Sequence, residues 1–292
     1  MIPKNFSIVG AGRLGTSLGA ALVRRGFRAE AIVDRDLRAA REGRRLIGAG
    51  RASTSLAAAA RAKGLVVIAV PDDAVGPVAA ALARSVPGGA WAGRDVFHTS
   101  GLVTAAALGP LARLGARTAS LHPVQSFPRK GARASIFAGI TWGIEGDREA
   151  VETGSGLARA LRGHVLLLGA GDKALYHAAC ALASNALVAL EWTAAELLEK
   201  AGVEGKAAAA TLLPLVQGTL QNVKSLGLEN ALTGPVARGD IGTVRKHLEA
   251  LEGQPEAREV YAALGKRILR LASERGLPAG RVRALRRLLE GK

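Results

Sequence analysis

The sequence has little of several residue types, and each shortage excludes a class of protein. Cys180 is the single cysteine, so the chain cannot hold an internal disulfide framework, and we expect a reducing, cytoplasmic location. The N-terminus runs almost at once into a predicted strand, which is unlike a secretory signal. The most apolar long stretch, residues 178–190, contains Ser184 and Asn185. We therefore expect no membrane span, because this stretch is too short and too polar. Aromatic residues make up only 3% of the chain, which predicts a core of Ala, Leu and Val.

The sequence also lacks the signatures of two kinds of catalysis. Its five histidines are scattered without a paired ligand spacing, and there is no cysteine pair, so no metal site is expected. It has no Gly-x-Ser-x-Gly turn, which argues against a serine nucleophile. What remains is hydride chemistry, in which a cofactor supplies the reaction and the protein supplies position and charge.

Acidic residues are fewer than basic ones, 24 against 40, which gives a net charge of +16. Such an excess is one mark of a nucleic-acid partner. The basic residues are spread along the whole chain, however, and the densest run, residues 266–287, keeps an apolar helical period without interleaved aromatic residues. A stacking surface would require those aromatic residues, so we expect no nucleic-acid partner.

Glycine, in contrast, is abundant, and three of the 37 glycines form a motif near the start. Residues 6–15 read as an apolar strand, a Gly-x-Gly-x-x-Gly turn and the first turn of a helix. Gly10 permits the tight turn, Gly12 lets a pyrophosphate approach the backbone, and Gly15 lets the helix pack against the strand. The N–H groups and positive dipole of that helix would face the phosphates. The motif therefore predicts a dinucleotide-binding site.

The residues around the motif support this prediction. An amphipathic helix follows, and Arg13 and Leu14 in its first turn are candidate cofactor contacts, although Arg13 could equally be solvated. A second apolar strand ends on Asp34, about 20 residues after the motif, where a ligand of the adenine ribose is expected. Asp34 disfavours the 2′-phosphate of NADP, whereas Arg35 could bind it. The choice between NAD and NADP therefore stays open.

The first part of the chain, residues 1–171, alternates between predicted strands and helices, which indicates a mainly parallel sheet. We predict an α/β fold with an N-terminal Rossmann doubly wound sheet. In such sheets ligands bind at the carboxyl ends of the strands beside the switch point. Val70 and Pro71 end one buried strand and Ser100 follows the next, so all three are expected to line the nicotinamide cleft.

The second part, residues 172–292, shows helical patterns only, with breaks that carry Gly or Pro. We predict an all-helical C-terminal domain that closes over a cofactor or pairs with a second copy of the chain. The expected helices cover residues 172–200, 206–226, 240–251, 255–275 and 278–289.

Polar residues form a row on the first of these helices. Lys173, His177 and Asn185 share one face, because His177 and Asn185 lie four and twelve residues after Lys173. Burying polar groups costs free energy unless they are paired, so the row either faces a ligand or forms a satisfied structural network. Farther along, Arg238 is either a bidentate clamp for a carboxylate or half of an ion pair at a helix start.

Taken together, these motifs resemble those of the pyrroline-5-carboxylate reductase, ketopantoate reductase and 6-phosphogluconate dehydrogenase-like group. Within that group they are most similar to Rossmann-like oxidoreductases whose C-terminal half is the domain of unknown function 2520. The motifs that carry the resemblance are residues 10–15, 67–72, Ser100-Gly101, His122-Pro123, 176–185 and 233–240.

The resemblance implies a nicotinamide-dependent reductase or dehydrogenase that forms a homodimer through its helical domain. It also implies that His122 and Ser184 contact the substrate. Related enzymes place a lysine and an asparagine one helical turn apart. Lys173 matches that lysine, but His177 stands where the asparagine is expected, and Asn185 lies two turns further on.

We therefore predict an NAD(P)-dependent oxidoreductase that transfers hydride to a small carbonyl or imine substrate bearing a carboxylate, ketopantoate-like or pyrroline-carboxylate-like. Lys173 or His177 would donate the proton. Asn185 would orient the substrate, and Arg238 would hold its carboxylate. The alternative is a dinucleotide-binding sensor or regulatory protein without turnover.

Overall fold

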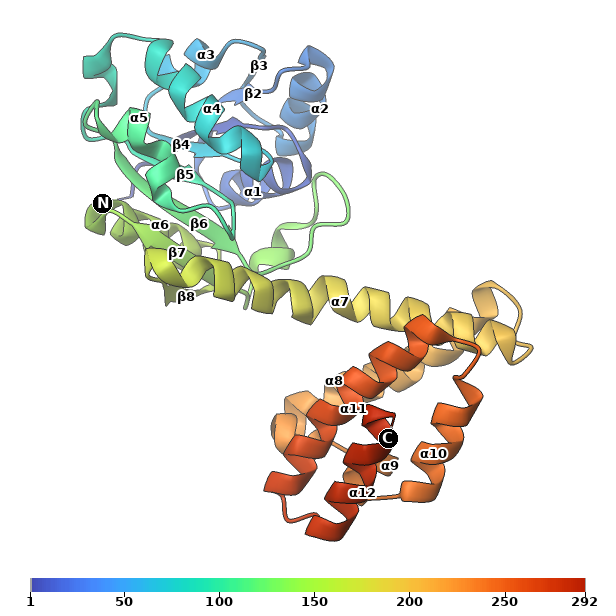
Figure 1. Ribbon diagram of the computed structural model, residues 1–292. Coiled ribbons are helices and arrows are strands. Elements are labelled where there is room, and N and C mark those ends of the chain that lie inside the picture. Colours follow the sequence, from blue (N-terminus) through green and yellow to red (C-terminus); the bar gives the residue numbers. More distant parts are fainter. Residues whose placement is uncertain (1, 292) are drawn as a thin grey trace. The chain divides into compact units, whose positions relative to one another are not determined.

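The computed structural model describes residues 2–291, which form two compact units. The first unit ends at Leu182 and the second begins at Ala183. The colours in Figure 1 follow the sequence from blue at the N-terminus to red at the C-terminus. The division falls inside the long helix α7 (Lys173–Lys200), whereas the sequence pattern predicts a domain boundary at residue 171.

Strands and helices alternate through the first unit. Its strands are β1 (Asn5–Val9), β2 (Arg28–Val33), β3 (Arg51–Ser53), β4 (Leu65–Ile68), β5 (Asp95–His98), β6 (Arg117–Pro123), β7 (Thr141–Gly146) and β8 (His164–Leu167). Its α-helices, before α7, are α1 (Arg13–Arg24), α2 (Leu37–Ile47), α3 (Leu56–Arg61), α4 (Asp72–Arg84), α5 (Gly109–Ala112) and α6 (Arg148–Ala160). Short 3₁₀ turns lie at Gly88–Trp91, Ala105–Leu108, Ala134–Phe137 and Ala170–Asp172.

The eight strands form one sheet in the order β3-β2-β1-β4-β5-β6-β7-β8. Neighbouring strands are parallel except for β6 and β7, which are antiparallel. The chain winds outward from β1 through β2 to β3 and then crosses to β4 on the other side of β1. The carboxyl ends of β1 and β4 therefore flank the switch point of a doubly wound sheet, which confirms the predicted fold class.

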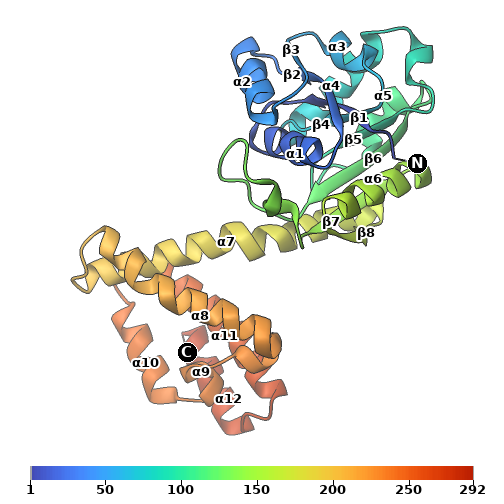
Figure 2. The ribbon, with the colours of Figure 1, turned by 180° about the vertical axis from the view of Figure 1, so that it is seen from behind.

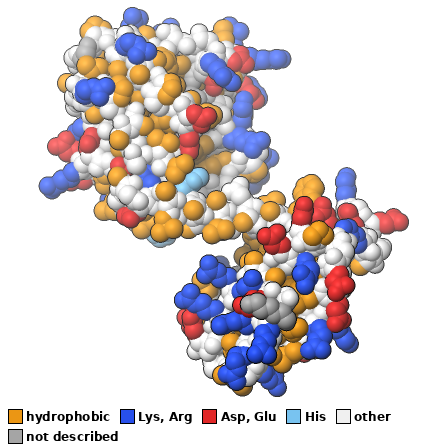
Figure 3. Space-filling model, in the orientation of Figure 1, with side chains coloured by type: hydrophobic (Ala, Val, Ile, Leu, Met, Phe, Trp, Pro, Cys, Tyr) orange, Lys and Arg blue, Asp and Glu red, His pale blue; other side chains and the backbone are white. Residues whose placement is uncertain are grey.

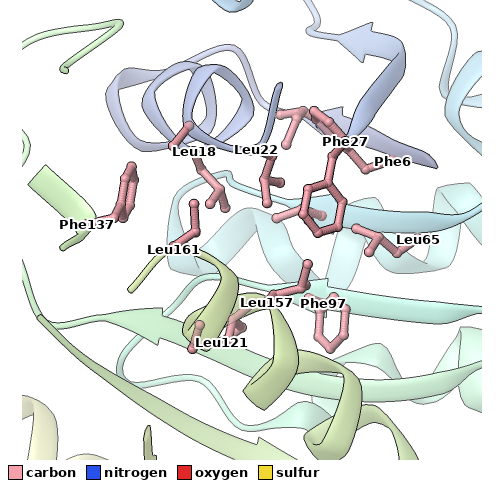
Figure 4. Packing of buried hydrophobic residues seen from close by; sticks show 14 of the residues in the cluster. Phe6, Leu18, Leu22, Phe27, Leu65, Phe97, Leu121, Phe137, Leu157 and Leu161 are labelled. Atoms are coloured by element: carbon pink, nitrogen blue, oxygen red, sulfur yellow. The ribbon is translucent and has the colours of Figure 1, made fainter. Parts of the chain in front are cut away.

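Both faces of this sheet are buried, because side chains alternate between two apolar clusters. In β4, Leu65 and Val67 pack in one cluster, and Val66 and Ile68 pack in the other. The first cluster includes residues of α1 and α6, and Figure 4 shows its leucines and phenylalanines packed between those helices and the sheet. The second cluster includes residues of α3, α4 and α5, and Figures 1 and 2 view the unit from opposite sides. This burial explains why the strands read as continuous apolar runs.

The second unit is helical throughout its described residues. It contains the second part of α7 and the helices α8 (Lys206–Ala231), α9 (Pro235–Arg238), α10 (Ile241–Ala250), α11 (Pro255–Glu274) and α12 (Ala279–Glu290). A small apolar core joins α9 to α12 and includes Val244, Leu269 and Leu285. Helix α8 carries a kink at Gly227, which has a φ of 77°.

Helices α7 and α8 bury very little of their own surface. Lys173 and Ala208 are the buried residues of these two helices within the described chain. Several large apolar side chains are exposed instead, and orange hydrophobic side chains follow α7 in Figure 3. By length and composition alone, the helical stretch Ala170–Lys200 meets the criteria for a membrane span, with a mean hydropathy of 1.3 in its most apolar window.

Candidate active site

The glycine turn after β1 has the geometry that its sequence predicts. Gly10 has a φ of 105°, and a Cβ there would lie 2.2 Å from the carbonyl oxygen of Ala69. A Cβ at Gly15 would lie 2.1 Å from the carbonyl oxygen of Gly10. These two positions therefore accept no side chain, because the turn and the first residues of α1 pack directly on backbone.

Gly12 differs from the other two glycines of the motif, because open space lies beside it. A Cβ at Gly12 would meet no atom within 4 Å. Gly12 is also the N-cap residue of α1, so the free N–H groups of the first turn begin there. This turn thus combines exposed amide donors with room for a ligand, as an anion-binding helix start requires.

A cavity of about 500 Å³ lies beside this turn, at the carboxyl ends of the strands. Six of the predicted cofactor contacts line this cavity. It is lined by Val9, Gly10, Gly12, Val33, Asp34, Arg35, Thr54, Leu56, Ala69, Val70, Pro71, Ala74 and Val78. Two further predicted contacts lie in the first turn of α1, where Arg13 is exposed and Leu14 packs against the apolar core.

Asp34 follows β2 on the rim of this cavity. Its Oδ2 accepts a hydrogen bond from the backbone N–H of Ala11 at 2.8 Å, and its Oδ1 accepts one from the N–H of Asp36 at 3.1 Å. Arg35 beside it is exposed to solvent. The rim therefore carries a carboxylate tied to the backbone and a guanidinium that can reach a ligand.

A second group of polar residues gathers around the start of α7, within the first unit. Lys173 is only 1% exposed, and its Nζ donates hydrogen bonds to the carbonyl oxygen of Ser100 at 3.2 Å and to Oγ of Ser120 at 2.5 Å. Burial lowers the pKa of the Lys173 ammonium, while the carboxylates of Glu145 and Asp72 oppose this shift. Lys173 is therefore an anchored lysine in a dry setting, as a tuned proton donor requires.

The loop that follows β5 holds Ser100 against this lysine. The Oγ of Ser100 accepts hydrogen bonds from the backbone N–H groups of Leu102 and Val103, at 3.1 and 2.9 Å. His98 supports the same loop, because its Nδ1 accepts from the N–H of Ser100 at 3.2 Å and its Nε2 lies 3.1 Å from the carbonyl oxygen of Thr104. Burial lowers the pKa of His98 to about 4, so its imidazole is neutral at pH 7.

His122 and His177 meet beside Gly101. A Cβ at Gly101 would lie 2.5 Å from Cδ2 of His177 and 3.0 Å from Nε2 of His122, so only a glycine leaves room for both rings. The ring centroids of the two histidines are 5.9 Å apart. The Nδ1 of His122 lies 2.8 Å from Oη of Tyr176. The structure thus brings together three of the predicted site residues, Lys173, His177 and His122, around the loop that contains Ser100.

Sequence reasoning missed Tyr176 and Ser120 as members of this group. Tyr176 stood only inside a longer motif, and Ser120 is one residue of a buried strand. Each reaches the group through contacts with residues more than 50 positions away, which no local pattern reveals.

The remaining predicted residues lie in the second unit. Ser184 and Asn185 are exposed on α7, and Arg238 is exposed at the end of α9. Arg238 borders a separate cavity of about 420 Å³ together with Thr233 and Arg275. Their participation in the same site stays a prediction.

Within residues 2–291, no group of three or more His, Cys, Asp or Glu side chains could hold a metal ion.

Comparison with family models gives two matches. Residues 4–123 match the Rossmann-like domain, and residues 140–268 match the domain of unknown function 2520. The comparison with curated proteins found no match.

Solved structures share the fold along most of the chain. Protein TM1727 from Thermotoga maritima is 24% identical, with a TM-score of 0.72 over 92% of this chain and 99% of that chain. The "putative NADP oxidoreductase BF3122 from Bacteroides fragilis" is 25% identical, with a TM-score of 0.71 over 90% of this chain and 97% of that chain. A reductive aminase from Aspergillus terreus is 20% identical, with a TM-score of 0.60 over 100% of this chain and 93% of that chain. The chain therefore consists of a Rossmann-like domain followed by the domain of unknown function 2520.

Proposed function

We propose that this protein is an NAD(P)-dependent oxidoreductase of the cytoplasm that reduces a small carbonyl or imine compound bearing a carboxylate. The observation that carries the proposal is the glycine turn, in which Gly10 and Gly15 are packed on backbone while Gly12 faces open space beside a cavity of about 500 Å³. The descriptions of two similar structures support this proposal. One is a putative NADP oxidoreductase, and the other is a reductive aminase in complex with NADPH and ethyl-5-oxohexanoate.

The residues of the turn fit a dinucleotide. The N–H groups at the start of α1 would hold the pyrophosphate, as helix N-termini do for other phosphates. Asp34 would accept from the adenine ribose, and Arg35 would hold a 2′-phosphate where one is present. Val70 and Pro71 line the same cavity on the side of β4, where they would contact the nicotinamide. The bound cofactor would supply the hydride.

The polar group at the start of α7 would supply the proton and the substrate contacts. Lys173 or His177 would donate a proton to the substrate atom that gains charge as hydride arrives. Lys173 is suited to this because burial lowers the pKa of its ammonium, and His177 because its imidazole ring lies beside Gly101 in the same group. Arg238 would hold the substrate carboxylate, Asn185 would orient the substrate, and His122 and Ser184 would contact it.

We also propose that a second copy of the chain is the partner of the second unit. Helices that are apolar on all sides are buried in the functional state. Yet Leu213, Leu215 and Leu220 of α8 are all more than half exposed, as are Val188 and Trp192 of α7. Every copy carries the same apolar surface, so a twofold dimer matches it against itself. We therefore interpret the hydropathy of α7 as a surface that pairs with a second copy of the chain, and not as a membrane span.

Two glycine variants test the proposed cofactor site. We expect Gly12→Ala to fold normally, because its Cβ meets no atom, but to lose at least about tenfold in affinity for NADH and NADPH, since a methyl group would occupy the pyrophosphate position. We expect Gly15→Ala to lose stability instead, because its Cβ would lie 2.1 Å from the carbonyl oxygen of Gly10. Calorimetric titration and thermal unfolding separate the two effects.

A Gly12→Ala protein that binds both cofactors like the wild type would refute the proposed pyrophosphate site. Binding without turnover on any carbonyl or imine compound would favour the dinucleotide sensor instead of the enzyme.

A further inference from the structure

The ring of His122 packs against the rings of two other residues, and the proposed function gives these contacts no role. It projects from β6, whereas Tyr176 and His177 are consecutive residues of α7. The centroid of the His122 ring lies 5.6 Å from that of Tyr176 and 5.9 Å from that of His177, with interplanar angles of 89° and 79°. Both neighbours therefore pack edge-on against the same imidazole and restrict its rotation.

Two glycines make this arrangement possible. A Cβ at Gly143 of β7 would lie 2.4 Å from Oη of Tyr176 and 2.7 Å from its Cζ. A Cβ at Gly101 would lie 3.0 Å from both Cε1 and Nε2 of His122. Gly143 thus admits the phenol, and Gly101 leaves space at the far side of the imidazole.

The hydrogen bond between Tyr176 and His122 selects one tautomer of the imidazole. The Nδ1 of His122 lies 2.8 Å from Oη of Tyr176. Burial raises the pKa of the Tyr176 phenol, so the phenol keeps its proton and can donate it. The thiol of Cys180 also lies near Oη, and a thiol sulfur is a weaker acceptor than an imidazole nitrogen.

The charge on the imidazole follows from its surroundings. Burial lowers the pKa of His122 to about 4, electrostatic interactions with His177 and Lys173 add to this effect, and Asp72 opposes it. The ring is therefore neutral at pH 7 and has one N–H group. Because Nδ1 accepts from Tyr176, that N–H group is on Nε2, beside Gly101 and His177.

We propose that Tyr176 is a positioning residue that fixes His122 in the Nε2–H tautomer, so that His122 donates a hydrogen bond to an acceptor oxygen of the substrate. The inference rests on the proposed function, because it assigns a specific role to a predicted substrate contact. This proposal gives the two histidines different roles. His122 is a neutral hydrogen-bond donor that orients the substrate, and the transferred proton comes from Lys173 or His177.

The tautomer itself can be measured without any turnover. Nitrogen-15 NMR of the imidazole resonances distinguishes Nδ1–H from Nε2–H forms of neutral histidine. We expect the wild-type protein with NADPH to show the Nε2–H form at His122, and Tyr176→Phe to show a mixture of both forms. An Nδ1–H form in the wild type, or an unchanged spectrum in Tyr176→Phe, would overturn the inference.

The second unit provides a matched control for this variant. The Nδ1 of His247 lies 2.9 Å from Oη of Tyr261, and their ring centroids are 5.7 Å apart with an interplanar angle of 83°. Tyr261→Phe removes the same kind of hydrogen bond from a pair outside the proposed site. We expect it to leave kcat/KM within twofold of the wild type, whereas Tyr176→Phe lowers kcat/KM about tenfold and leaves the Kd for NADPH within twofold.

A second substitution distinguishes positioning from a structural role. The amide nitrogen of His122→Gln stands in for Nε2–H and has no tautomer to select. We expect this variant to keep part of the activity and to be insensitive to the further change Tyr176→Phe. An equal tenfold loss in both backgrounds would contradict the positioning role. Failure of the wild-type protein to bind either NADH or NADPH would refute the proposed function instead, while the NMR result would still stand.

Discussion

The carboxylate of Asp34 accepts a hydrogen bond from the backbone N–H of Ala11, with 2.8 Å between Oδ2 and the nitrogen. Ala11 stands inside the glycine turn, between Gly10 and Gly12. The acid at the end of β2 therefore fastens the turn to the neighbouring strand, besides any contact that it makes with a ribose. A carboxylate has lone pairs for both tasks. Because this hydrogen bond holds the turn whichever cofactor is present, we expect Arg35 to contribute more than Asp34 to the selectivity between NADH and NADPH.

Arg35 is the residue whose removal should separate NADPH from NADH. It is exposed on the rim of the cavity, where a 2′-phosphate would add a charge-assisted contact. We expect Arg35→Ala to weaken NADPH binding about tenfold and to leave NADH binding within twofold. Arg41→Ala, an exposed arginine of α2 away from the cavity lining, is the control. Equal losses of affinity for NADH and NADPH in fluorescence titrations would show that Arg35 makes no contact with the 2′-phosphate.

His177 should matter for turnover and not for cofactor binding. Its ring packs beside Gly101 in the group around Lys173 and not in the lining of the cofactor cavity. We expect His177→Ala to lower kcat about 100-fold or more, as loss of a general acid does, with the Kd for NADPH within twofold. His164→Ala, an exposed histidine of β8, should have no effect. Unchanged turnover in His177→Ala would remove His177 from the mechanism and leave Lys173 as the proton donor.

Lys173→Met tests the other proton donor and the anchoring of the loop after β5. Methionine fills a similar volume but cannot donate to the carbonyl oxygen of Ser100 or to Oγ of Ser120. We expect a folded protein with turnover reduced about 100-fold or more. Lys130→Met, which removes an ion pair with Glu42 at the surface, is the control. Wild-type kcat in Lys173→Met, measured beside far-ultraviolet circular dichroism, would make this lysine purely structural.

Buried His98 should make the protein less stable as the pH falls from about 6.5 to about 4. Burial lowers its folded-state pKa from 6.5 to about 4. Between these values the unfolded chain binds a proton that the folded protein does not, so stability rises with pH. The contribution between pH 7 and pH 5 is roughly 2 kcal/mol. We expect His98→Asn to reduce this dependence when urea unfolding is compared at both pH values. An identical dependence in the variant would mean that His98 titrates normally.

The glycine turn could be predicted from the sequence because all of its determinants are contiguous. Strand, turn and helix follow one another within residues 5–24, and the roles of Gly10, Gly12 and Gly15 follow from local geometry. The position of Asp34 could be predicted because it directly follows the strand after that helix. The hydrogen bond between Asp34 and Ala11 could not be predicted, because it depends on how β2 lies beside β1.

The group around Lys173 was less predictable, because it is assembled by tertiary contacts. Lys173, His177 and His122 were singled out one by one, but the links through Ser120 and Tyr176 need the neighbouring positions of β6, β7 and α7. A single helical pattern over residues 104–114 is divided in the structure into Ala105–Leu108 and Gly109–Ala112. Pro110 lies in the first turn of the second piece, where a proline is tolerated because its missing N–H group would have no partner there.

Self-association should depend on the exposed apolar surface of α7 and α8. Leu215 is 69% exposed on α8. Burying a leucine stabilises a complex by about 1.5–3 kcal/mol, and burying an unpaired carboxylate costs more than that. We therefore expect light scattering to give twice the chain mass for the wild type and the single chain mass for Leu215→Glu. Leu264→Glu on α11, where the leucine is 43% exposed, should remain dimeric. A wild-type protein that is monomeric in buffer and floats with lipid vesicles would show that α7 contacts a membrane instead of a second copy.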